Sequence, residues 1–124
     1  MPISTSAIDL ISRLEESTSA ELDALDFGVI GFDRDEMVVR YNRSEAERSG
    51  LSVDRVVGKH LFEQVAPCTN NYMIAERFRT EAELDDELDY VFTLRMKPTP
   101  VHLRLLADPA TDTRYMIVTD SDSD

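Results

Sequence analysis

The sequence is poor in cysteine, in lysine and in long apolar runs, and each shortage limits what the protein can be. Cys68 is the only cysteine of the 124 residues, so the chain can form no internal disulfide. No second cysteine or nearby histidine gives it the spacing of a metal site. No apolar run reaches about 18 residues, which predicts no transmembrane helix. The N-terminus lacks a basic segment followed by an apolar one, so we expect no signal peptide and a cytoplasmic location.

Positive charge is also scarce. Acidic residues outnumber basic ones by 25 to 13, which gives a formal net charge of −12 and argues against nucleic acid or an anionic membrane as a partner. Lys59 and Lys97 are the only lysines. An acidic, lysine-poor surface remains soluble at high salt, so the composition predicts a halophilic host, with an ordinary acidic bacterial protein as the alternative. A melting temperature that does not rise in molar salt would contradict the halophilic interpretation.

Residues 1–25 predict a small helical cap. Ser6 followed by Asp9 is typical of a helix start, and Thr18 with Glu21 forms a capping-box pattern for a second short helix. Apolar residues follow Ser6 at helical spacing, namely Ile8, Ile11 and Leu14. The segment has few large apolar residues, so we expect it to be weakly docked.

Residues 26–119 predict one α+β domain with a five-stranded, mostly antiparallel sheet flanked by short helices. Strands are expected at 27–32, 37–41, 88–96, 101–105 and 115–119. Helices are expected after Asn42, from Ser52 to Val57, and from Tyr72 to about Leu84, with an irregular segment at 60–69. Residues 120–124 are acidic and without apolar side chains, and predict a disordered tail.

Several groups of residues, by their order and spacing along the chain, resemble the photoactive yellow protein family, whose architecture is the PAS fold. The resemblance extends from about residue 22 to residue 106, with a shorter segment between Cys68 and Tyr90 and only a loose match in the cap. The groups are Asp26-Phe-Gly-Val-Ile30, Tyr41-Asn42-x-x-Glu45, Val57-Gly58-Lys59, Phe62-x-x-Val65-Ala66-Pro67-Cys68-Thr69 and Tyr90-x-Phe92-x-x-x-Met96-x-Pro98-Thr99-x-Val101.

The resemblance implies a blue-light receptor, not an enzyme, that carries p-coumaric acid (4-hydroxycinnamic acid) as a thioester on Cys68. The residues matching Tyr41 and Glu45 hydrogen-bond the chromophore's phenolate. Light drives trans–cis isomerisation, the proton of Glu45 passes to the phenolate, and the cap loosens. A buried carboxylate left without a counter-charge would favour this opening. We expect a monomer or weak dimer that signals to a downstream protein, whose identity the sequence leaves open.

The remaining expected site residues surround this group. Ser49 replaces the usual threonine and can still bond Tyr41, whereas Leu51 replaces an arginine that often shields the pocket mouth. The residue matching Met96 assists thermal re-isomerisation in the family. The full expected set is Cys68, Tyr41, Glu45, Ser49, Leu51, Phe62, Val65, Ala66, Pro67, Thr69, Tyr90, Phe92 and Met96.

Each of these residues also has a simpler interpretation. Cys68 can be a small buried hydrophobe, and Glu45 can close a capping box with Asn42. Four of the expected pocket residues can be ordinary core, namely Phe62, Val65, Phe92 and Met96. The competing functions are a chromophore-free PAS module that binds proteins or a diffusible ligand and, more weakly, a cysteine-dependent enzyme. His60 and His102 lack ligand spacing, so no metal site is expected.

Overall fold

The computed structural model describes residues 7–92 and 98–120 of the chain. Its centre is a five-stranded antiparallel sheet with strand order β2-β1-β5-β4-β3. The strands are β1 (Gly28–Phe32), β2 (Val38–Tyr41), β3 (Leu84–Phe92), β4 (Thr99–Ala107) and β5 (Arg114–Asp120). The helical elements are α1 (Ala7–Glu16), α2 (Ser19–Asp23), α3 (Arg43–Ser49), α4 (Val53–Val56), η1 (Leu61–Val65), η2 (Pro67–Thr69) and α5 (Ala75–Thr80). The expected α+β class and five-stranded antiparallel sheet are confirmed.

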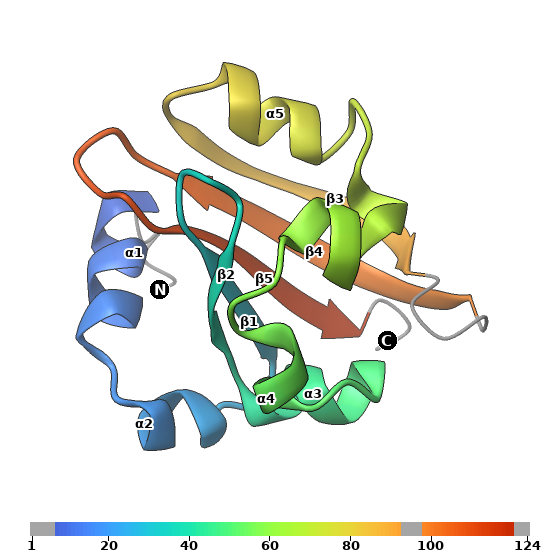
Figure 1. Cartoon of the computed structure of the whole chain (residues 1–124). Coiled ribbons are helices and arrows are strands. Elements are labelled where there is room, and N and C mark those ends of the chain that lie inside the picture. The colour runs from blue at the N-terminus through green and yellow to red at the C-terminus, as the bar shows by residue number, and fades with distance from the viewer. Residues whose placement is uncertain (1–6, 93–97, 121–124) are drawn as a thin grey trace, which may run out of the picture.

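The sheet has a core on each face. Alternate side chains of a strand point to opposite faces, so β1 sends Ile30 into the larger core and Val29 into the smaller one. The larger core is covered by the helical elements between β2 and β3, and the smaller one by α1 and α2. In Figure 1, α1 lies away from α5, whereas α2 comes close to α3, where the Arg43 N–H donates a hydrogen bond to Asp23 Oδ1 at 2.8 Å. All five residues of β1 are therefore buried.

Local signals place α3 where the sequence predicts it. The side chain of Asn42 accepts a hydrogen bond from the Glu45 N–H at 3.2 Å, as expected of an N-cap. Gly50 ends the helix with φ 79°, a left-handed conformation that glycine adopts without steric cost. The helix consequently presents Glu45 and Ser49 as buried residues.

The cap is docked more firmly than the sequence predicts. Ile11, Leu14 and Leu22 are almost fully buried in the smaller core. Arg40 on β2 also donates hydrogen bonds to the carbonyl oxygens of Leu14, at 2.7 Å, and of Ser17. The expectation of weak docking is therefore wrong, because strand residues distant in sequence complete the interface. The expected capping box of α2 is present, with Thr18 and Glu21 bonded reciprocally, and Ser6 lies outside the described residues.

The predicted helix from Tyr72 to about Leu84 is wrong at both ends. The side chain of Asn71 accepts hydrogen bonds from the N–H groups of residues 73 and 74, which forms a turn and delays the helix until Ala75. Beyond Thr80 the chain becomes extended, and Leu84 pairs with Ala107. The strand β3 therefore begins four residues earlier than the alternation of apolar residues suggests.

The other boundaries differ by a few residues. β4 already includes Thr99 and Pro100, which were expected to interrupt the strands. β5 includes Asp120, the first residue of the expected tail, paired with Val101. Residues 121–124 lie outside the described part.

Within the described residues no helix is long and apolar enough to cross a bilayer.

Candidate functional site

A chain of hydroxyl groups begins at the end of α3. The Leu51 N–H donates to Ser49 Oγ at 3.1 Å, and Ser49 Oγ lies 2.8 Å from the hydroxyl of Tyr41. Tyr41 is 5% exposed and Ser49 4% exposed. When Ser49 donates to Tyr41, the phenolic proton of Tyr41 is free to bind a further acceptor, and each bond in such a chain strengthens the next. The expected contact between Ser49 and Tyr41 is present.

The environment keeps Tyr41 protonated. Burial raises the pKa of Tyr41 well above its ordinary value, and the nearby Glu45 raises it further, against an opposing effect of the Ser49 hydrogen bond. Desolvation disfavours the phenolate form because its charge loses contact with water. Tyr41 therefore keeps its phenolic proton and can donate it in a hydrogen bond.

Glu45 is fully buried on α3 and is paired with Arg48. Its Oε1 lies 2.9 Å from Arg48 Nη1, one turn along the helix. The same Nη1 also donates to the Val118 carbonyl oxygen at 3.3 Å, which ties α3 to β5. The sequence-based mechanism treats Glu45 as a carboxylate without a counter-charge once its proton has left. The structure corrects that expectation, because Arg48 supplies the positive charge.

Of the two hydrogen bonds that a capping box between Asn42 and Glu45 requires, the structure contains one. Asn42 does cap the Glu45 N–H, but its own N–H donates to the Val29 carbonyl oxygen at 3.2 Å. The amide group of Asn42 also accepts from the Val29 N–H at 2.9 Å and donates to the carbonyl oxygens of Leu22 and Phe27, each at 2.9 Å. Asn42 therefore joins the cap, β1 and the helix that carries Glu45.

Cys68 lies in the short turn η2, half-buried against the larger core. Its carbonyl oxygen accepts hydrogen bonds from the Tyr90 hydroxyl at 2.5 Å and from Asn71 Nδ2 at 3.2 Å. Asn71 Nδ2 also lies 2.5 Å from the Tyr90 hydroxyl. These contacts fix the main chain at Cys68 while its side chain borders the core that contains Tyr41.

The other expected site residues divide by burial. Phe62, Val65, Ala66 and Phe92 are buried in the larger core, which agrees with their interpretation as core. Leu51 and Tyr90 pack against it as half-buried residues. Thr69 is buried and its hydroxyl donates to the Ala66 carbonyl oxygen at 2.7 Å, a contact that stabilises η2. Pro67 is exposed, and Met96 lies outside the described residues.

The sequence reasoning missed Arg48 and Asn71. The separation of three between Glu45 and Arg48 on a predicted helix is a readable signal for an ion pair. Asn71 carried no such signal, because its contact with Tyr90 joins residues 19 positions apart.

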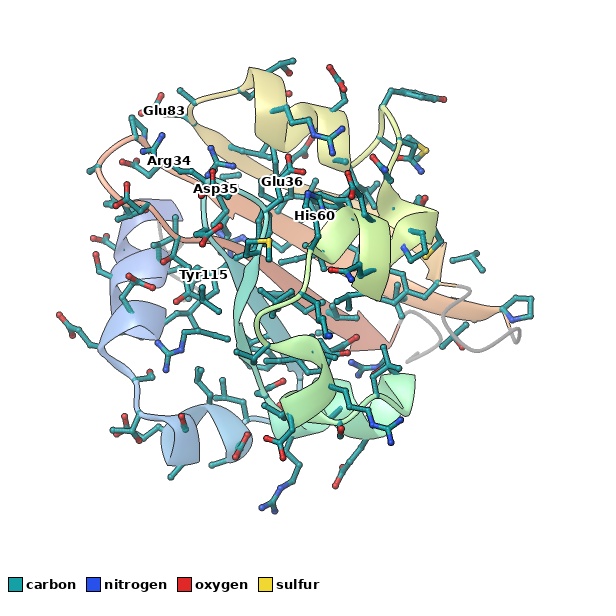
Figure 2. The ribbon with its side chains drawn as sticks, viewed as in Figure 1. Arg34, Asp35, Glu36, His60, Glu83 and Tyr115 are labelled. Atoms are coloured by element: carbon teal, nitrogen blue, oxygen red, sulfur yellow. The ribbon has the colours of Figure 1, made fainter. Side chains whose placement is uncertain are left out.

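The two histidines have structural partners. His60 accepts the Glu63 N–H on Nδ1 at 3.2 Å, and its Nε2 lies 3.2 Å from Glu36 Oε1 (Figure 2). His102 contacts Glu87 and Asp89 on the exposed face of the β3–β4 pair. In the described part of the chain no three His, Cys, Asp or Glu side chains are placed to hold a metal ion.

Comparison with known proteins agrees with this architecture. A family model for the PAS fold matches residues 16–119. Photoactive yellow protein of Rhodothalassium salexigens is 31% identical over 113 residues, which cover 89% of this chain and 90% of that protein. Photoactive yellow protein of Halochromatium salexigens is 32% identical over 113 residues, with the same coverage.

Among solved structures, the photoactive yellow protein domain of the sensor histidine kinase Ppr from Rhodospirillum centenum has a TM-score of 0.81 and 35% identity. The match covers 88% of this chain and 98% of that domain. The fold thus defines a PAS domain. The chain belongs to the photoactive yellow protein family, as the sequence motifs predict.

Proposed function

We propose that this protein is a blue-light receptor that binds p-coumaric acid as a thioester on Cys68. The observation that carries the proposal is the position of Cys68, half-buried at the edge of the same core that contains the protonated, buried Tyr41. A covalent aromatic ligand with a phenolic end requires both an accessible thiol and a buried donor. The residues present fit such a group.

Each end of the site has a distinct role. The thiolate of Cys68 attacks an activated acyl group, the carbon–sulfur bond forms, and the activating group leaves. Hydrogen bonds from Tyr90 and Asn71 hold the Cys68 main chain in place. At the other end, Tyr41 would donate a hydrogen bond to the phenolic oxygen of the bound group, and Glu45 would share a proton with that oxygen. The bound group supplies light absorption and trans–cis isomerisation.

The signal is a change in how the cap is held. Asn42 is the N-cap of the helix that carries Glu45, and it also bonds the Leu22 carbonyl of the cap. A shift of α3 after proton movement at Glu45 therefore acts on the cap directly. We propose that the loosened cap, or the surface it uncovers, is what a downstream signalling protein recognises.

Reconstitution tests the proposal. Incubation of the protein with p-coumaric anhydride or the coenzyme A thioester of p-coumarate should add one p-coumaroyl mass and produce a visible absorption band. Cys68→Ala should show neither change, whereas Thr80→Ser, at an exposed position outside the expected site, should still form the adduct. A folded wild-type protein that stays colourless would overturn the proposal and favour a PAS module without a chromophore.

A further inference from the structure

Arg48 is a half-buried cation that pairs with the buried carboxylate of Glu45. Its side chain is 14% exposed and that of Glu45 is 0% exposed, and their ion pair of 2.9 Å lies between α3 and β5. A guanidinium can be accommodated at such a depth only where acceptors surround it, and Glu45 Oε1 together with the Val118 carbonyl provides them. The pair therefore lies on the same helix as Ser49, which is the hydrogen-bond partner of Tyr41.

We propose that Arg48 is the counter-ion of Glu45 and sets how the proton of this site is divided between Glu45 and the bound ring. The inference rests on the proposed function. A cation next to a carboxylate favours its ionised form. Arg48 therefore draws the shared proton away from Glu45 and towards the ring oxygen, and it stabilises the carboxylate that remains after light absorption.

This role changes the energetics of the signal. A buried carboxylate without a counter-charge costs several kcal/mol, by order of magnitude, and would itself force the structure open. With Arg48 in contact, that cost is largely offset. The light-driven opening in this protein is accordingly smaller than it would be with an apolar residue at position 48.

The charge state of Glu45 can be measured in the protein without chromophore. Carbon-13 NMR of labelled glutamate carboxyl groups at pH 7, with Glu45→Gln to assign the signal, should show Glu45 ionised in the wild type. Arg48→Met should raise its ratio of protonated to ionised form by about ten-fold or more, and Arg48→Lys should restore the wild-type signal. Arg43→Met is the matched control, since Arg43 lies on the same helix with an exposed side chain.

A Glu45 signal that Arg48→Met leaves unchanged would overturn the inference and leave Arg48 as a structural residue only. If Arg48→Met does not fold, Arg48→Gln keeps a hydrogen-bond donor without the charge and decides the same question.

The loaded protein gives a second readout. In Arg48→Met the shared proton should lie closer to Glu45, so that the phenolate carries more negative charge and spreads it over the chromophore. The dark absorption band should therefore move to longer wavelength, whereas Arg43→Met should leave it in place. An unshifted band in Arg48→Met would overturn the inference. Failure to form any adduct would count against the proposed function, while the NMR result would still decide whether Arg48 is the counter-ion.

Discussion

The carboxylate of Glu45 lies directly against the backbone of Gly28. A Cβ atom at position 28 would overlap Glu45 Oε1 and would lie 2.9 Å from Arg48 Nη1. Glycine at the start of β1 thus makes the space in which the ion pair of α3 sits. The start of β1 and the helix α3 are therefore fitted to each other around the buried carboxylate of Glu45.

We predict that Gly28→Ala destabilises the protein by about 1–3 kcal/mol, the usual cost of overpacking a filled core. It should also separate Glu45 from Arg48. Urea unfolding measures the first effect, and the position of the chromophore absorption band reports the second.

Gly31→Ala is a matched control on the same strand. A Cβ there would lie 2.9 Å from Cε1 of Tyr115, on the side of the sheet that the cap covers. It should destabilise the protein without moving the absorption band. An equal band shift in both variants would mean that Gly28 has no special relation to Glu45.

The sequence was sufficient to predict helix boundaries where the contacts that determine them are local. Asn42 and Gly50 fix the ends of α3 within a few residues, and Thr18 with Glu21 fixes the start of α2. The family motifs are also local signals, since they record spacing along the chain, and they were enough to predict the family to which the chain belongs.

The sequence was insufficient where the contacts are distant. The cap depends on Arg40, which is 26 residues from its acceptor Leu14. The start of β3 depends on pairing with β4, where Arg104 reaches Asp85 at 3.0 Å. The periodicity of apolar residues identifies neither the contact of Arg40 with the cap nor the pairing of β3 with β4.

The halophilic host stays a prediction, for which the melting temperature with and without molar salt is the measurement.

Arg40 should control how firmly the cap is held. We predict that Arg40→Met increases amide hydrogen exchange in α1 and the Glu16–Thr18 connection, because it removes the donors to the Leu14 and Ser17 carbonyl oxygens. Illumination of the loaded wild-type protein should raise exchange in the same residues. Arg34→Met is the control, since Arg34 bonds the loop around Asp112 and not the cap. Unchanged protection of the cap in light would remove it from the signalling path.

Glu36 should make the free energy of unfolding depend on pH in the acidic range. Two hydrogen bonds from Arg79, at 2.7 and 2.9 Å, hold the pKa of Glu36 below its ordinary 4.5, against the opposing effect of burial. Figure 2 shows Glu36 beside His60, which adds a further favourable contact. Because the folded-state pKa is lowered, the stabilisation is fully present above about pH 4.5 and is lost as the pH falls through the folded-state value.

We predict that Glu36→Gln lowers the free energy of unfolding at pH 7 by about 1 kcal/mol, a modest value because solvent screens the partly exposed Arg79. The difference from wild type should shrink as the pH is lowered from 4.5 through the folded-state pKa of Glu36, because the carboxyl is then protonated in the folded as well as in the unfolded wild type. Urea unfolding over a series of pH values from 7 downwards is the measurement, with Glu47→Gln, exposed on α3, as the control. A difference that stays constant over the whole series would show that the carboxylate charge is not the cause.

Glu45→Gln tests the mechanism at its centre. The N-terminus of α3 favours an ionised carboxylate by about 0.3–1 kcal/mol when exposed, whereas burial beside a phenolate disfavours it by up to ~3–5 pKa units in general. Arg48 opposes the second effect. We predict that these effects leave a proton shared between Glu45 and the ring of the bound chromophore in the dark. Glutamine donates a weaker hydrogen bond, so the phenolate charge should spread and the absorption band should move to longer wavelength.

Infrared difference spectra separate this mechanism from a purely structural ion pair. The wild-type spectrum should contain a protonated-carboxyl band that is lost on illumination, since Glu45 gives up its share of the proton. The band should be stronger in Arg48→Met, where the carboxylate has lost its counter-ion, and absent in Glu45→Gln. The light-driven rise in cap exchange should shrink in Glu45→Gln because no proton leaves position 45 and α3 then has no cause to shift. A band missing from both wild type and Arg48→Met would mean that Glu45 only anchors α3 to β1 and β5.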